Sequence, residues 1–230
     1  MKMNSPLKIK IMKTNESLQK DVQDAIKWEP LLHAAEIGVI VKDGIVTLTG
    51  TVDSYSKKIE AETAAKKVAG VKAVVEDIDI DYGHFGVSTD EEVAMEIIKA
   101  FKSSISVPDE KVKVKVEDGW VTIDGTVNWD YQRRASKNAI VNLKGVKGVT
   151  NNIKINSELK DEVEKKEIEK ALQRNWAINS DDIYVDVNNN EVKLSGVVDS
   201  FYEKDEAERI AWNAPGVWAV NNQLVVESFD

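Results

Sequence analysis

The stretch Asp43–Ser54, DGIVTLTGTVDS, places two glycines six residues apart among β-branched residues. Glycine loops of this kind cradle phosphate groups when Gly-Lys-Ser or Gly-Lys-Thr follows and opens a helix. No such sequence follows Gly50, and the residues after it do not begin a helix at once. A phosphate-binding loop is therefore rejected. Asp43-Gly44 is instead a preferred pair for a two-residue turn between two strands of a hairpin.

Side chains suited to catalysis or metal binding are few and scattered. The two histidines, His33 and His84, lie in different segments, and the chain contains no cysteine. Neither the H-x₃₋₅-H spacing of zinc sites nor thiolate chemistry is therefore available. Asp77, Asp79 and Asp81 alternate along an expected strand and could hold a hard cation, although a solvated strand face explains the same pattern. We predict no catalytic residue, no cofactor and no metal site.

The composition is that of a soluble globular protein. Of 230 residues, 42% are hydrophobic and 31% are charged, and no apolar run approaches the roughly 18 residues that span a bilayer. Residues 1–15 carry four lysines but lack the apolar segment of a secretory signal. This favours the cytoplasm, or the periplasm if the chain is a mature form.

Charge is distributed unevenly along the chain. The net charge of −9 argues against a nucleic-acid partner, which requires a positive surface. Residues 16–82 carry 8 basic and 13 acidic groups, residues 88–157 carry 11 and 10, and residues 158–230 carry 8 and 17. The middle segment is thus the only one that is not clearly acidic.

One pattern occurs three times. The segment from Asp43 is matched by DGWVTIDGTVNW from Asp118 and by NNEVKLSGVVDS from Asn189, at offsets of 75 and 71 residues. The same offsets align apolar positions upstream and downstream without a gap, which indicates tandem repeats. The predicted organisation is an N-terminal extension (1–15) followed by three domains (16–82, 88–157 and 158–230).

Each repeat follows one order of elements. Leu18, Val22 and Ile26 have the spacing of one helical face, and residues 37–41 alternate as in a strand with one buried face. A second strand follows the hairpin turn, a second helix runs from about Tyr55 to Ala69, and an apolar third strand ends the unit. The prediction is an α+β fold of three α-β-β-α-β domains, each a three-stranded mixed sheet with two helices on one face.

Two glycines recur in every repeat and are interpreted as structural. Gly70 fits the C′ position after the second helix. Gly50 lies within or at the end of a strand, where glycine marks a bulge or a close backbone approach, here one that lets a helix pack tightly on the sheet. The equivalents of Gly70 are Gly145 and Gly216, and those of Gly50 are Gly125 and Gly196.

The hairpin DG-x-V-T-L-T-G-x-V, an alanine- and lysine-rich helix and V-x-G-V-x-x-V before an apolar strand together resemble the BON domain. The resemblance covers nearly the whole chain three times. It implies attachment to phospholipid membranes, envelope maintenance and protection against osmotic stress, with small ligands or cations bound by some members. It implies no enzymatic activity.

The segment NWDYQRRASK is the candidate contact site. Trp129 precedes the second helix of the middle repeat, and Arg133 and Lys137 follow at helical spacing. An aromatic residue beside cations on one helix face is typical of interfacial lipid binding. A partly buried tryptophan covered by arginine is the alternative. The other tryptophans are interpreted mainly as packing or domain-interface residues, because none recurs in all three repeats.

Two functions follow from these patterns. The first is a non-enzymatic BON-repeat protein that docks on an anionic phospholipid surface or a protein partner under stress. The alternative is a sensor or chaperone-like stress protein that binds a small ligand or a cation between its repeats.

Overall fold

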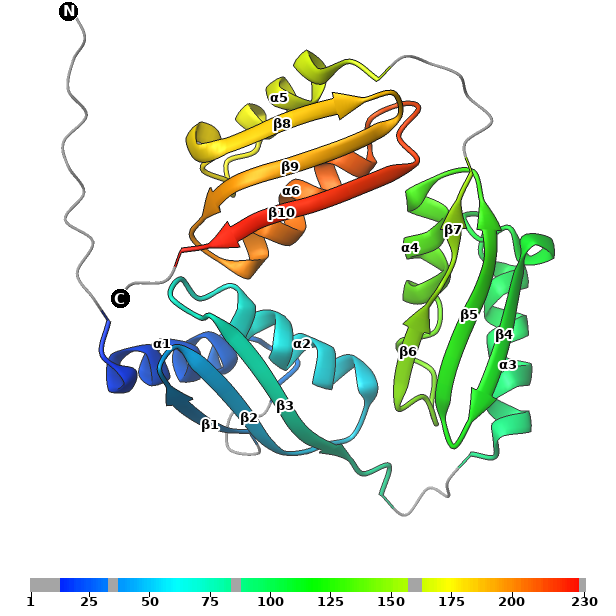
Figure 1. The fold of residues 1–230 in the computed structure, drawn as a ribbon. Helices are drawn as coiled ribbons and strands as arrows, with labels where there is room; N and C mark the ends of the chain where they lie inside the picture. The colour runs from blue at the N-terminus through cyan, green and yellow to red at the C-terminus, as the bar shows by residue number, and fades with distance from the viewer. Residues whose placement is uncertain (1–12, 33–36, 84–87, 157–162, 228–230) are drawn as a thin grey trace, which may run out of the picture.

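The computed structural model describes residues 13–32, 37–83, 88–156 and 163–227. Within these ranges the chain folds as three successive units, each a mixed sheet with two helices (Figure 1). The predicted α+β class and the three tandem α-β-β-α-β domains are confirmed.

The elements follow the same order in each unit. The first unit contains α1 (Asn15–Lys27), β1 (Ile37–Lys42), β2 (Ile45–Val52), α2 (Tyr55–Lys66) and β3 (Ala73–Ile80). The second contains α3 (Asp90–Ser103), β4 (Val112–Glu117), β5 (Trp120–Val127), α4 (Asp130–Asn138), β6 (Gly148–Asn151) and β7 (Lys154–Ile155). The third contains α5 (Lys165–Arg174), β8 (Ile183–Asn188), β9 (Glu191–Val198), α6 (Phe201–Trp212) and β10 (Ala219–Val226).

The second strand is central in each sheet. It pairs antiparallel with the first strand through a two-residue turn and parallel with the third strand. Asp43, Asp118 and Asn189 each adopt a positive φ of 51–55° in these turns, as a type I′ hairpin requires of its first central residue. In the middle unit the third strand is interrupted, so that β6 and β7 pair separately with β5.

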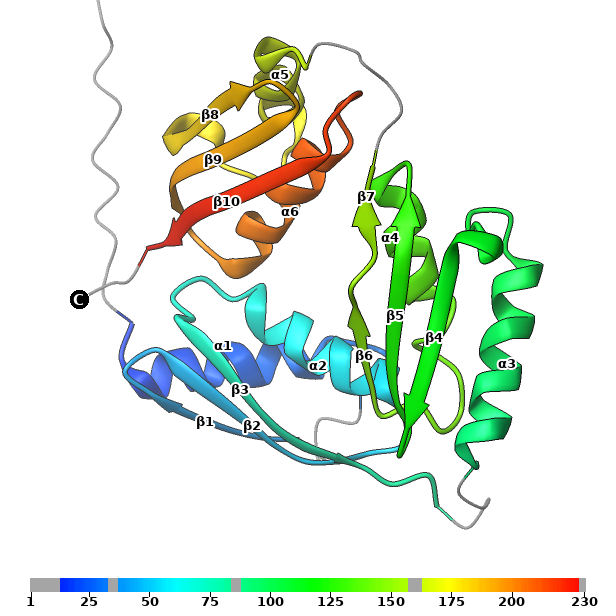
Figure 2. The same cartoon turned by 45° about the vertical axis from the view of Figure 1, so that its right-hand side comes forward.

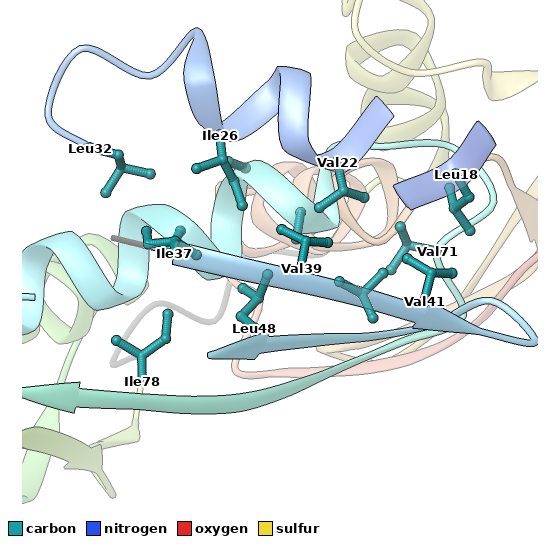
Figure 3. Packing of buried hydrophobic residues seen from close by; sticks show 14 of the residues in the cluster. Leu18, Val22, Ile26, Leu32, Ile37, Val39, Val41, Leu48, Val71 and Ile78 are labelled. Atoms are coloured by element: carbon teal, nitrogen blue, oxygen red, sulfur yellow. The ribbon is translucent and has the colours of Figure 1, made fainter. Parts of the chain in front are cut away.

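The core of the first unit lies between its helices and one face of its sheet (Figure 3). Leu18, Val22 and Ile26 of α1 are buried against strand residues that include Val39 and Leu48. These are the residues whose helical and alternating spacing predicts the elements. Burial of each such side chain contributes about 1.5–3 kcal/mol.

The end of the second helix differs from the prediction. α2 ends at Lys66 with Lys67 as its C-cap, so the predicted end at Ala69 and the C′ role of Gly70 are wrong. Gly70 lies in the turn that follows, where its φ of +96° explains the glycine. Its equivalents Gly145 and Gly216 have φ values of +88° and +82°.

The strand glycines confirm a close backbone approach, but to a different partner. A Cβ on Gly125 would overlap the carbonyl oxygen of Lys111, and one on Gly196 would overlap that of Asp182. Both carbonyls belong to 3₁₀ turns that lead into the first strand of their units. The expected packing of a helix against this position is therefore wrong. Gly50 shares the positive φ of these two residues.

The three units are arranged in a ring with α2, α4 and α6 facing its centre (Figures 1 and 2). α2 and α6 contact each other directly, which brings the third unit against the first. Each unit therefore meets both others. A head-to-tail contact that repeats and closes after three copies is the geometry of a cyclic trimer, here built within one chain.

Candidate functional site

The predicted contact site lies at the start of α4. Trp129 is the residue before this helix and is half-buried. Its backbone N–H and that of Asn128 both donate to Gln132 Oε1 at 3.1 Å. The bond from Trp129 satisfies an N–H group that a helix start leaves without an intrahelical partner.

Asp130 is the charged centre of this segment. Its side chain is almost completely buried, and its two carboxylate oxygens lie 2.5 Å from Arg133 Nη2 and 2.8 Å from Arg134 Nε. A buried carboxylate is tolerated only when it is paired. The two arginines therefore neutralise a buried carboxylate, a role that their sequence spacing does not predict.

Both arginines also contact the third unit. The Arg133 guanidinium lies 4.5 Å from the ring centroid of Trp212, within range of a cation–π interaction. Arg134 Nη2 donates to Asn213 Oδ1 at 3.2 Å. Of the two interpretations open from the sequence, arginine stacking on a tryptophan is present, but the ring belongs to Trp212 at a domain junction and not to Trp129.

The residues equivalent to Asp130 form the other two junctions. Tyr55, at the start of α2, packs against the core of the second unit, and its hydroxyl accepts from Val149 N–H at 3.3 Å. Phe201, at the start of α6, packs against the core of the first unit. Burial raises the pKa of the Tyr55 hydroxyl above its ordinary value. Tyr55 and Phe201 thus contact the next unit directly, whereas Asp130 pairs with the two arginines that do so.

A second hydroxyl reinforces the junction between the first two units. Tyr82 donates from its hydroxyl to the carbonyl oxygen of Val146 at 2.6 Å, and burial raises its pKa. Tyr82 lies at the end of the first unit, just before the segment that leads to the second.

Lys137 lies beside a cavity between the first two units. The cavity has a volume of about 670 Å³ and is lined by Leu31, Ile59 and Glu60 on one side and by α4 and the turn after it on the other. Arg133 and Lys137 both line this cavity and Trp129 does not, so the structure brings together two of the three predicted residues.

Most of the tryptophans do not pack as expected. Trp212 forms a junction and Trp129 is half-buried, but Trp28, Trp120, Trp176 and Trp218 are all exposed. The interpretation of the tryptophans as mainly packing or interface residues is therefore wrong. Trp120 is a partial exception, because its ring covers Gly148 at the point where a side chain would otherwise stand.

The loop between the first helix and the first strand exposes a large apolar residue in each unit. The exposed fractions are 85% for Trp28, 106% for Ile105 and 95% for Trp176. Ile105 and Trp176 occupy the same position of the repeat, where the first unit has Pro30 between Trp28 and the exposed Leu31. We call Trp28, Ile105 and Trp176 the loop tips.

A basic residue precedes each loop tip. Lys27, Lys102 and Arg174 lie in the last turns of α1, α3 and α5 and are exposed. Each tip therefore combines an apolar group with a nearby cation. The available sequence signal was an apolar residue that falls outside both the helical and the strand spacing.

The third tip is held by a hydrogen-bonded network. Asn175 Nδ2 donates to Glu206 Oε1 at 2.8 Å, and Asn175 Oδ1 accepts from Ala177 N–H at 2.9 Å. Arg209 Nε donates to Glu206 Oε2 at 2.6 Å, and its second nitrogen contacts Oε1. The bond from Arg209 is the main cause that holds the pKa of Glu206 below its ordinary value.

The described residues contain neither a metal-binding cluster nor a membrane-spanning helix. Both histidines, His33 and His84, lie outside the described residues. No group of three His, Cys, Asp or Glu side chains with metal-binding geometry occurs among the residues described, and Asp77, Asp79 and Asp81 are exposed. None of the described helices has the length and apolar character needed to cross a bilayer.

Comparison with known proteins decides the family. The BON domain family matches residues 14–82, 89–157 and 160–228. The chain belongs to the BON domain family. Among curated proteins it is similar to the osmotically-inducible protein Y of Escherichia coli, with 29% identity over 144 residues, which cover 61% of this chain and 72% of that protein.

Two solved structures of CdsD, a structural protein of the type III secretion system of Chlamydia trachomatis, were also matched. Each has 17% identity and a TM-score of 0.25, with 92–94% of this chain and 92–100% of the other covered. At this level of similarity they add nothing to the functional assignment.

Proposed function

We propose that this BON protein is a non-enzymatic stress protein that attaches to an anionic phospholipid surface through its three loop tips. The stress role is supported by its similarity to the osmotically-inducible protein Y. The observation that carries the attachment is the repeated exposure of Trp28, Ile105 and Trp176, each preceded by a cation. Apolar groups beside basic residues suit the boundary between lipid headgroups and acyl chains.

Three tips suit a surface better than a single binding pocket. The proposal requires the three equivalent loops to reach one lipid surface together. Each tip adds to the same attachment, and three weak contacts in one chain bind more tightly than any one alone. Full removal of a large apolar side chain from water is worth about 1.5–3 kcal/mol, or about tenfold in partitioning per tip.

The test is co-sedimentation with vesicles that contain phosphatidylglycerol at low ionic strength. We expect the wild-type protein to sediment and the triple variant Trp28→Ser, Ile105→Ser, Trp176→Ser to lose at least a hundredfold in partitioning. The control replaces three exposed large residues on the strands, Ile40, Tyr184 and Val225, with serine. Equal loss in both variants, or no sedimentation of the wild type, would refute attachment by the tips.

The set predicted from sequence, Trp129, Arg133 and Lys137, stays a prediction for headgroup binding. The variant Trp129→Ala with Arg133→Ala tests it in the same assay. Because Arg133 contacts Asp130 and Trp212, the urea midpoint of this double variant is measured in parallel. Weaker sedimentation with an unchanged midpoint would support this set, and unchanged sedimentation would exclude it.

Binding of a small ligand between repeats is the second candidate. The cavity between the first and second units is the observation that favours it.

A further inference from the structure

The cavity between the first two units has the size of a small-molecule site. Its volume of about 670 Å³ falls within the range of about 300–1,000 Å³ that such sites occupy. It lies at a boundary between domains, a preferred place for ligand sites. A ligand there would contact both units at once.

Apolar side chains from both units line the cavity, and together we call them its apolar wall. Leu31 and Ile59 belong to the first unit, and Val141 lies in the turn after α4. Leu31 is 59% exposed although it is a large apolar residue. This wall suits a hydrocarbon or aromatic group of limited length.

The side of the cavity formed by α4 carries positive charge. Arg133, Arg134 and Lys137 project from α4, with the first and last four residues apart and hence on one helix face. The two arginines share Asp130, whereas Lys137 forms no ion pair within the described part of the chain. Lys137 is half-buried, so an anion beside it would be screened less than one at an open surface.

The carboxylate of Glu60 also lines the cavity. Burial, and secondly the charge of Glu29, raise the pKa of Glu60 above its ordinary value. Arg133, Arg134 and Lys137 together outnumber this group and the Asp130 that the arginines share. Asn138 of α4 and Asn142 of the turn after it also line the cavity, and their amides supply neutral hydrogen-bond donors.

We propose that this cavity binds a small amphipathic anion, with a carboxylate, sulfonate or phosphate head at Lys137 and an apolar body against Leu31, Ile59 and Val141. A neutral solute leaves the lysine without a counter-charge, and a bare inorganic anion leaves the apolar wall empty. The proposal rests on the second candidate function, not on vesicle attachment by the tips. Because the ligand contacts both units, binding also stabilises the junction between them.

The test is calorimetric titration of the full chain with decanoate below its micelle concentration. Octanoate, hexanoate, decanol and inorganic phosphate are titrated for comparison. We expect affinity to increase with the length of the carboxylate chain and both decanol and phosphate to bind at least tenfold more weakly than decanoate. No binding of decanoate, or equal affinity for decanoate and decanol, would overturn the proposal.

The decisive variant is Lys137→Gln, with Lys99→Gln on the exposed face of α3 as the matched control. Loss of a charge-assisted contact predicts roughly tenfold weaker decanoate binding for Lys137→Gln and none for the control. Unchanged binding by Lys137→Gln overturns the assignment of the head to this lysine.

Vesicle sedimentation of the same variants identifies the source of the anion. Unchanged sedimentation of Lys137→Gln assigns the site to a free solute. Parallel loss of vesicle and decanoate binding assigns the anionic head to a lipid. The loop-tip variant should still bind decanoate, so that failure of this proposal and failure of attachment by the tips are distinguished.

Discussion

The second helices and the first-helix loops recur in all three units, yet they face different surroundings. The first residues of the second helices are Tyr55, Asp130 and Phe201, and all three form or support contacts between units. The loop tips are large apolar residues that contact solvent. The first residue of the second helix varies in type while its position stays the same. Among the loop tips, Ile105 and Trp176 share a position and Trp28 lies two residues before it.

This difference shows that location in the repeat decides use more than residue type does. Arg133 and Trp212 are residue types typical of lipid binding, but they contact each other within the molecule. Isoleucine is a residue type typical of protein cores, but Ile105 is exposed. A charged junction at Asp130 and aromatic junctions at Tyr55 and Phe201 also predict different responses to substitution.

The largest expected effect on stability is at the charged junction. Asp130→Asn leaves Arg133 and Arg134 without their shared carboxylate, and loss of one partner of a buried pair costs about 3 kcal/mol. We expect a lower urea midpoint and weaker contact between the second and third units. Asp53→Asn, which breaks the more exposed pair with Lys57, is the control and should cost less than about 1 kcal/mol. Equal effects of the two would contradict the importance of the charged junction.

A smaller effect is expected at the aromatic junction that closes the ring. Phe201 is only partly buried against the first unit, so Phe201→Ala should cost about 2 kcal/mol, below the 3–5 kcal/mol of a fully buried phenylalanine. The third unit should separate from the first, which small-angle scattering would detect as a larger radius of gyration. The neighbouring exposed residue offers a control, Tyr202→Ala, which should leave the radius unchanged. An unchanged radius in Phe201→Ala would show that this contact does not close the ring.

Residue spacing predicts the elements within each unit but not the contacts between units. The spacing of Leu18, Val22 and Ile26 encodes which side of α1 is buried, and three copies in register were enough for the fold. Periodicity contains no information on which unit meets which. The pairing of Arg133 with Trp212 therefore could not be predicted, and neither could the packing of Phe201 on the first unit.

The glycines mark a similar limit. The recurrence of Gly125 and Gly196 indicates that a side chain is excluded, and the structure confirms this. It does not indicate what excludes the side chain, which proves to be a carbonyl of the preceding 3₁₀ turn. Recurrence of a single residue type does not predict the loop tips, because Ile105 and Trp176 share a position in the repeat and not a type.

The smallest effect concerns the network behind the third tip. Because the pKa of Glu206 is lowered in the folded protein, its contribution is present above the unfolded value near 4.5 and is lost as the pH falls through the folded value. Arg209 is partly exposed, so Glu206→Gln should cost only about 0.5 kcal/mol at pH 7. In the wild type, amide exchange at Ala177 should quicken as the pH falls below this range, after correction for intrinsic rates. Glu206→Gln should lack this increase in exchange rate at low pH, and the control variant Glu169→Gln should retain it.

The comparison between tips and junctions is tested most directly by fluorescence of single-tryptophan variants. One variant keeps only Trp176 and another keeps only Trp212, with phenylalanine at the other five positions. Vesicles of phosphatidylglycerol with brominated acyl chains should quench Trp176 and shift its emission to the blue, and leave Trp212 unchanged. Quenching of Trp212, or no quenching of Trp176 in vesicles that bind the protein, would contradict attachment through the loop tips.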